Sequence, residues 1–89
     1  MHDDSIPTLA PSHRFQWEEA QNCYVLLYPE GMVKLNPSAA EILKHCDGTQ
    51  TVRAIIAALQ QQYPDVDLEG DVHEFLEVAH GNGWLYPQG

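Results

Sequence analysis

The chain has 89 residues, enough for one small domain with a buried core but too few for a catalytic cleft together with a cofactor-binding domain. Hydrophobic residues make up 44% and charged residues 19%, which is typical of a folded chain and excludes a disordered one. Thirteen acidic residues against four basic ones give a net charge of -9. This charge disfavours nucleic acid and anionic membrane surfaces as partners, because both are bound through clustered Lys and Arg.

Residues 1–13 are expected to form a flexible, weakly packed N-terminal segment. They contain Pro7 and Pro11 and few large apolar side chains. They also lack an apolar run of signal-peptide length, which predicts a cytoplasmic protein. We expect regular structure to begin near Arg14, with residues 14–86 forming a single domain.

Three β-strands are predicted next. Phe15 and Trp17 alternate with polar neighbours, as in a half-buried strand, and the apolar run CYVLLY, residues 23–28, is typical of a central strand. In the PEG turn that follows, Pro29 presets φ and Gly31 is free to adopt a positive φ, so the chain reverses tightly. The third strand is then formed by Met32, Val33, Lys34 and Leu35. In the simplest antiparallel order the second strand is internal, and the first and third are edges.

The first of three predicted helices begins after these strands. Asn36 is suited to the N-cap and Pro37 to the first helical position, while Gly48 can close the helix. Its apolar stripe has helical spacing and consists of Ala39, Ile42, Leu43 and Cys46. Because Cys46 completes this stripe and Cys23 lies on a predicted strand, we expect both thiols to be reduced.

The second and third helices have equally regular apolar spacing. Thr51, or Thr49 before it, can cap the second helix, which stops before Pro64. Asp67 is the expected cap of the third, and Gly81 its expected end. The apolar stripes are Val52, Ile55, Ile56 and Leu59 in the second helix and Leu68, Val72, Phe75, Leu76 and Ala79 in the third.

The predicted fold class is α+β. Three short strands cannot cover their own apolar face, so the helices must supply the second layer. Trp84 and Leu85 are expected to fold back on this layer as an apolar clasp. A three-stranded antiparallel sheet followed by three helices predicts a winged-helix-like architecture.

Catalytic and metal sites are not predicted. His45 and Cys46 are adjacent but project in different directions on a helix. His73 and His80 share a helix face, but about 10 Å of helix separates them, too far to bind one metal ion. No nucleophile elbow or Gly-rich phosphate loop is present. We therefore expect no enzymatic activity, cofactor or metal.

Two helices joined by a short turn also suggest a DNA-binding unit, but the charges argue against it. The second helix offers only Arg53, and the third has neither Lys nor Arg while carrying several acids. Because DNA binding depends on neutralising phosphates, nucleic acid is disfavoured.

The third strand offers a different site. A sheet edge presents unpaired N–H and C=O groups to which an extended peptide can add as a further strand. Lys34 could equally be a charge that prevents aggregation at a free edge, and the residues alone leave both interpretations open. Val78 lies beside Phe75 at the border of the third helix's apolar stripe, where it could line a groove or simply be exposed.

Residues 17–52, WEEAQNCYVLLYPEGMVKLNPSAAEILKHCDGTQTV, resemble the pyrroloquinoline quinone (PQQ) biosynthesis protein PqqD family. The segments WEE, VLLYPEG, LN, AAEIL and CDG, in this order, carry the resemblance. It implies a winged-helix-like recognition element for ribosomally made, modified peptides (RiPPs), without catalysis of its own. Such a protein binds the precursor peptide PqqA and presents it to the radical S-adenosylmethionine enzyme PqqE.

The resemblance also implies where the peptide lies. The precursor is expected to add as a strand beside the third strand, in a groove against the third helix. The implied peptide-binding residues are Met32, Val33, Lys34, Leu35, Asp71, Phe75, Val78 and Asn82. The alternative is a non-catalytic scaffold for the biosynthetic enzymes, or a homodimer formed through the free sheet edges.

Overall fold

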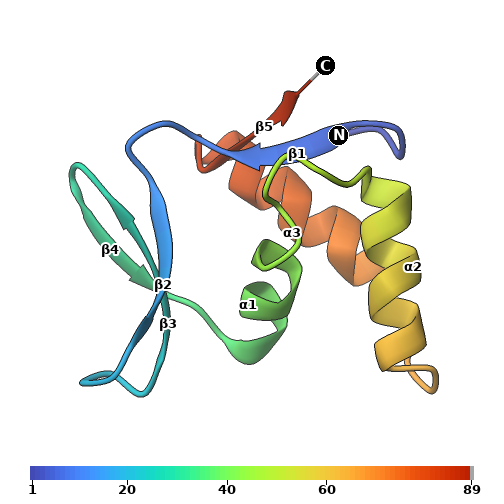
Figure 1. The fold of residues 1–89 in the computed structure, drawn as a ribbon, viewed down its shortest axis with the longest axis horizontal. Coiled ribbons are helices and arrows are strands. Elements are labelled where there is room, and N and C mark those ends of the chain that lie inside the picture. The colour runs from blue at the N-terminus through green and yellow to red at the C-terminus, as the bar shows by residue number, and fades with distance from the viewer. Residues whose placement is uncertain (89) are drawn as a thin grey trace.

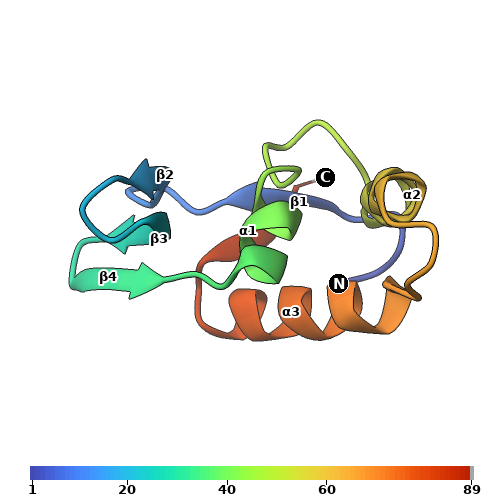
Figure 2. The ribbon, with the colours of Figure 1, turned by 90° about the horizontal axis from the view of Figure 1, so that it is seen from below.

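A computed structural model of the chain describes residues 1–88 and has a mixed α+β fold, as predicted (Figure 1). Its elements are β1 (Ile6–Leu9), β2 (Arg14–Glu18), β3 (Cys23–Tyr28), β4 (Gly31–Lys34), α1 (Pro37–Leu43), α2 (Val52–Gln62), α3 (Glu69–Gly81) and β5 (Leu85–Gln88). In Figure 2 the sheet of β2, β3 and β4 stands beside the helices, and of its three strands β4 is drawn closest in height to α3. No helix in residues 1–88 is long and apolar enough to span a bilayer.

The three-stranded antiparallel sheet has the predicted order β2-β3-β4, with β3 in the centre. Its register places Phe15 and Val33 on either side of Leu26, which is fully buried. The turn between β3 and β4 differs from the prediction, because Gly31 does not adopt a positive φ. Instead, Gly31 pairs directly with Tyr28, so the reversal is made by the two intervening residues.

Residues 6–9 form a strand where the sequence predicted a weakly packed segment. β1 pairs antiparallel with β5 in a second sheet, and Pro7 lies opposite Pro87. The Ala10 N–H donates to the Trp84 carbonyl at 2.9 Å. Antiparallel ladders alternate between hydrogen-bonded and non-hydrogen-bonded residue pairs, and counting from this bond makes Pro7 and Pro87 a non-hydrogen-bonded pair. Their missing N–H groups therefore cost the ladder nothing.

The predicted helix caps of α1 and α2 are confirmed. The Asn36 side chain accepts a hydrogen bond from the Ala39 N–H at 2.8 Å, and Thr51 Oγ1 accepts one from the Ala54 N–H at 3.1 Å. Asp67 accepts from the Glu69 N–H at 3.3 Å, although the residue at the N-cap of α3 is Leu68.

Helix α1 is shorter than predicted. It ends at Leu43, and Gly48 lies beyond the intervening loop, where its φ is +82° and its N–H donates to the Pro7 carbonyl. Cys46 also lies outside the helix, yet its side chain is buried as predicted. The loop after α1 therefore ties this part of the core to β1.

The core lies between the helices and the two sheets. It joins residues from the central strand, all three helices, β5 and the segments on either side of α1: Leu26, Leu35, Ala39, Ile42, Leu43, Cys46, Val52, Ile55, Leu59, Val72, Leu76, Ala79 and Leu85. Trp84 packs against it, and Leu85 is buried, as expected of an apolar clasp. This packing sets α3 in place through β5 as well as through α1.

Cys46 is predicted to resist alkylation. Its thiol donates to the Ile42 carbonyl at 3.3 Å, and burial raises the pKa of Cys46 from 9.0 to about 12. Because the thiolate is the nucleophile, native protein treated with iodoacetamide at pH 8 should be labelled at the partly exposed Cys23 and not at Cys46. In denaturant both should react, as read by mass spectrometry.

The same raised pKa has a consequence for stability. The folded chain favours the protonated thiol, so the contribution of Cys46 is complete below about pH 9 and declines as the pH rises toward 12. Rapid labelling of Cys46 in native protein at pH 8 would contradict the buried position.

Deleting residues 1–9 should lower the free energy of unfolding by more than ~2 kcal/mol, because it exposes surface covered by Pro7 and unpairs β5. Urea unfolding measures the change. The control is Asp4→Ala, which removes the exposed Arg53–Asp4 ion pair but keeps β1, and should have little effect. Equal stabilities for the deletion and the full chain would mean that β1 contributes nothing to the fold.

Candidate functional site

The outer side of β4 is unpaired in the described residues, since β4 hydrogen-bonds only to β3 in its sheet. The Leu35 N–H donates to the Tyr24 carbonyl at 2.9 Å, which makes Leu35 and Tyr24 a hydrogen-bonded pair. Antiparallel ladders alternate, so Val33 also directs its backbone groups toward β3. Met32 and Lys34 therefore direct their N–H and C=O groups away from the sheet, a choice that the sequence left open.

The side chains of this strand alternate in burial. Leu35 is 6% exposed and Val33 packs against the core, whereas Met32 is 42% exposed and Lys34 is also exposed. The four predicted strand residues thus divide into two roles. Val33 and Leu35 anchor the strand, and Met32 and Lys34 present free backbone groups.

A hollow of about 330 Å³ opens just beyond the C-terminal end of β4. We call it the α1/α3 groove, and it is lined by Asn36, Ser38, Ala39, Ile42, Asp71, Glu74, Phe75 and Val78. Phe75 is partly buried against the core, while Val78 is 53% exposed. The flank of α3 that carries Val78 therefore lines a groove, and three of the predicted helix residues come together there.

Asn82 lies in a different hollow, near the start of β4. This hollow has a volume of about 390 Å³ and is lined by His13, Tyr28, Glu30, Asn82, Gly83 and Trp84. The His13 ring stacks on Tyr28 with centroids 5.9 Å apart. The two hollows lie toward opposite ends of α3. Asn82 is one turn beyond Val78, to whose carbonyl its N–H donates at 3.0 Å, and about three turns beyond Asp71.

The α1/α3 groove is negatively charged. Asp71 and Glu74 line it from α3, a helix without Lys or Arg, and neither carboxylate forms an ion pair within residues 1–88. Sequence reasoning missed Glu74, although its helical spacing of three from Asp71 places the two on one face. An apolar floor with an acidic wall suits a peptide that carries both apolar and basic side chains.

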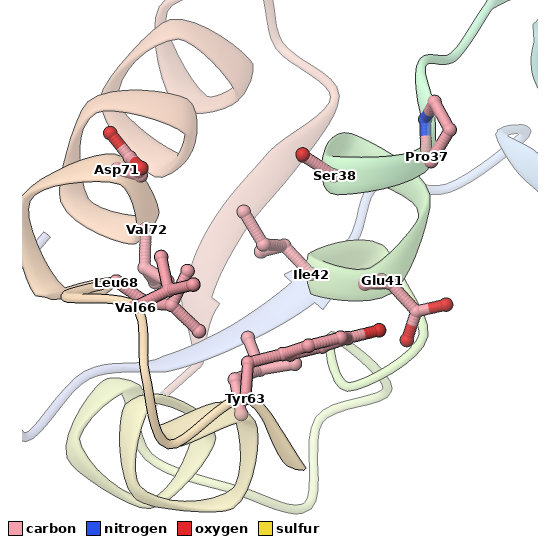
Figure 3. A pocket seen from close by; sticks show the side chains of 10 residues that line it. Pro37, Ser38, Glu41, Ile42, Tyr63, Val66, Leu68, Asp71 and Val72 are labelled. Carbon is pink, nitrogen blue, oxygen red and sulfur yellow. The ribbon is translucent and has the colours of Figure 1, made fainter.

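A third hollow, which the sequence did not predict, lies among α1, α2 and α3 (Figure 3). It has a volume of about 360 Å³, and we call it the Ile42 pocket. Its lining comes from α1 (Pro37, Ser38, Glu41, Ile42), the end of α2 (Leu59, Tyr63) and the start of α3 with the loop before it (Val66, Leu68, Asp71, Val72). It combines residues far apart in sequence, which no local pattern indicates.

The groups that could support metal binding are dispersed. Residues 1–88 contain no cluster of three or more His, Cys, Asp or Glu side chains able to hold a metal ion. His73 lies 2.9 Å from an Asp3 carboxylate oxygen, so its nearest acidic partner is in the N-terminal segment.

Comparisons with known proteins agree on one family. The model of the family described as coenzyme PQQ synthesis protein D (PqqD) matches residues 23–85. A protein of Azotobacter vinelandii named PqqA binding protein is 58% identical over 92% of this chain and 90% of its own length. One of the same name from Methylococcus capsulatus is 47% identical over 96% of this chain and 91% of its own.

A solved structure shares the fold. The solution structure of the PqqD part of Methylobacterium extorquens PqqCD, described as a functional and stand-alone RiPP recognition element, superimposes with a TM-score of 0.80 at 30% identity. The match covers 97% of this chain and 94% of that one. With its sheet, helices and central motif all matched, the chain belongs to the PqqD family of coenzyme PQQ synthesis proteins.

Proposed function

We propose that this chain binds the precursor peptide PqqA as an added strand on β4 and presents it to the radical S-adenosylmethionine enzyme PqqE. The observation that carries the proposal is the free outer edge of β4, where Met32 and Lys34 direct their backbone groups away from β3. The name PqqA binding protein, borne by relatives that are 58% and 47% identical to this chain, supports the identity of the peptide.

Strand addition gives the edge and the groove separate tasks. Backbone pairing with Met32 and Lys34 sets the register of the peptide, whatever its sequence. Alternate peptide side chains then face the apolar wall of Phe75 and Val78, so the groove selects among peptides. Asn82 would contact the same peptide at the opposite end of β4.

The role of the chain in this proposal is non-catalytic. Ordering a flexible precursor costs conformational entropy, so the affinity for the peptide alone is expected to be moderate. Because the chain has a net charge of -9, it would associate faster with a basic surface of the enzyme, and salt would weaken that attraction. The cytoplasmic location expected from the sequence belongs to the same proposal.

Proline at position 34 tests the pairing. Lys34→Pro removes an outward N–H and should weaken PqqA binding about tenfold or more while the fold persists, because proline is tolerated at a free edge. Titration calorimetry measures the affinity, and cross-linking of PqqA by PqqE in the presence of each variant gives a second readout. Lys34→Ala is the matched control, since it removes the charge but keeps the N–H. It should bind PqqA and support its cross-linking by PqqE like the parent chain.

Val33→Pro completes the comparison. It removes an N–H that faces β3, so it should destabilise the sheet instead of acting on binding alone. Equal, mild effects of Lys34→Pro and Lys34→Ala on affinity would reject strand addition. If peptide binding were retained but the variants altered only self-association, the edge would serve a homodimer.

Val78 provides a test of the groove. Val78→Ser removes apolar surface at an already half-exposed site, so it should leave thermal stability nearly unchanged but weaken PqqA binding about fivefold. Val78→Ile retains the apolar wall and should bind like the parent chain. By contrast, Leu76→Ala, two residues earlier on the buried face of the helix, should cost ~2–5 kcal/mol of stability. Unchanged affinity in Val78→Ser would mean that Val78 does not contribute to the peptide-binding site.

A further inference from the structure

The Ile42 pocket leaves apolar side chains accessible between the helices. Figure 3 shows Ile42 directed into the space above the Tyr63 ring, with Val66, Leu68 and Val72 on the opposite wall. Tyr63 is 39% exposed and Val66 48% exposed. A volume of about 360 Å³ lies at the low end of the range for binding pockets, which suits one or two side chains better than a folded partner.

The rim of this pocket carries a carboxylate without a partner. Glu41 is matched by Lys44, whose Nζ lies 2.8 Å from its Oε1. Asp71 forms no ion pair in the part of the chain that the structure describes, and Figure 3 places it across the opening from Ser38. The pocket is therefore complementary to an apolar side chain that has a cation beside it.

The pocket is continuous with the α1/α3 groove. Ser38, Ile42 and Asp71 line both hollows, so Ile42 stands on the boundary between them. A chain that leaves the edge of β4 near Asn36 passes along the groove and reaches the pocket without crossing another element. Asp71 is accessible from both sides of this boundary.

We propose that the Ile42 pocket is a second anchoring subsite for the precursor peptide. It takes an apolar side chain from outside the strand-paired segment, with a neighbouring Lys or Arg against Asp71. This inference rests on the proposed function, because it assigns more of the same peptide to the surface. It defines the substrate class more narrowly, as a peptide with a strand-forming segment and a separate apolar residue next to a basic one.

A second copy of the chain fits this pocket less well. Each copy has a net charge of -9 and only four basic residues, one of which, Lys44, already pairs with Glu41. Two copies meeting at the pocket would bring acidic surfaces together, which is unfavourable. A peptide with its own basic residue relieves the charge of Asp71 instead.

Two variants test the subsite with synthetic PqqA as the probe. Val66→Lys places an ammonium group in the apolar wall and should weaken binding about tenfold. Asp71→Asn removes the rim charge and should weaken binding severalfold, with less dependence on salt than in the parent chain. The matched control is Asp65→Asn, which makes the same charge change outside the pocket lining and should have no effect. If Val66→Lys fails to fold, Tyr63→Ala decides the question, because Tyr63 lines the Ile42 pocket but not the α1/α3 groove and is 39% exposed.

Alanine replacements along PqqA identify the anchored residue. Replacing one apolar PqqA residue outside the paired segment by alanine should weaken binding to the parent chain but not to Val66→Lys, because that variant has already lost the contact. Such a difference shows that the peptide residue and Val66 are directly coupled. Isotope-labelled protein should also show peptide-induced shifts at Tyr63 and Val66, as well as at Met32 and Lys34. Such coupling together with these shifts would support the subsite.

The outcomes separate this inference from the proposed function. Shifts at β4 without any at Tyr63 and Val66, together with unchanged affinity in Val66→Lys and Tyr63→Ala, would overturn the subsite and leave strand addition standing. An effect of Asp71→Asn alone would then belong to the α1/α3 groove, which Asp71 also lines. No shift at β4 or the pocket at saturating PqqA would reject both. Shifts at the pocket that depend on protein concentration in the absence of peptide would assign it to a second copy and overturn the inference.

Discussion

The hydrogen bond from the Leu35 N–H to the Tyr24 carbonyl sets the direction of the backbone groups along the whole of β4. Leu35 is buried in the core, so the register of β4 on β3 cannot shift without moving this side chain into solvent. Once that register is set, alternation determines the outward direction of the backbone groups of Met32 and Lys34. Core packing and the candidate binding edge are therefore two consequences of one pairing.

The other wall of the site depends on a part of the chain remote from β4. Helix α3 is followed after three residues by β5, which is paired along its length with β1, and Leu85 is buried at the start of β5. The N-terminal strand thus helps to position Phe75 and Val78 without contributing to the lining of the α1/α3 groove.

The three hollows differ in the chemistry of the side chains that line them. The Asn82 hollow combines an amide with the stacked rings of His13 and Tyr28, whereas the α1/α3 groove and the Ile42 pocket combine apolar floors with carboxylates. A backbone edge alone would accept many peptides, because its hydrogen bonds carry no side-chain information. In the proposed function, selectivity therefore comes from the hollows near either end of β4.

The sequence by itself determined the elements whose signals are local. The strands β2 and β3, the caps Asn36 and Thr51, and the buried stripe of α1 follow from side-chain period and capping chemistry, and each is present in the structure. The exposed position of Val78 beside Phe75 also followed from helical spacing. The family motif in residues 17–52 then supplied the fold and the expected peptide.

Only the tertiary structure decided the features that depend on partners distant in the chain. Pro7 and Pro87 argue against strands locally, yet they occupy a position in the β1–β5 pair where no N–H is required. Which residues of β4 face outward, the separation of Asn82 from the α1/α3 groove, and the Ile42 pocket all arise from packing between remote elements. Periodicity reports the face of one element, whereas a ladder register or a pocket is a property of two or more elements together.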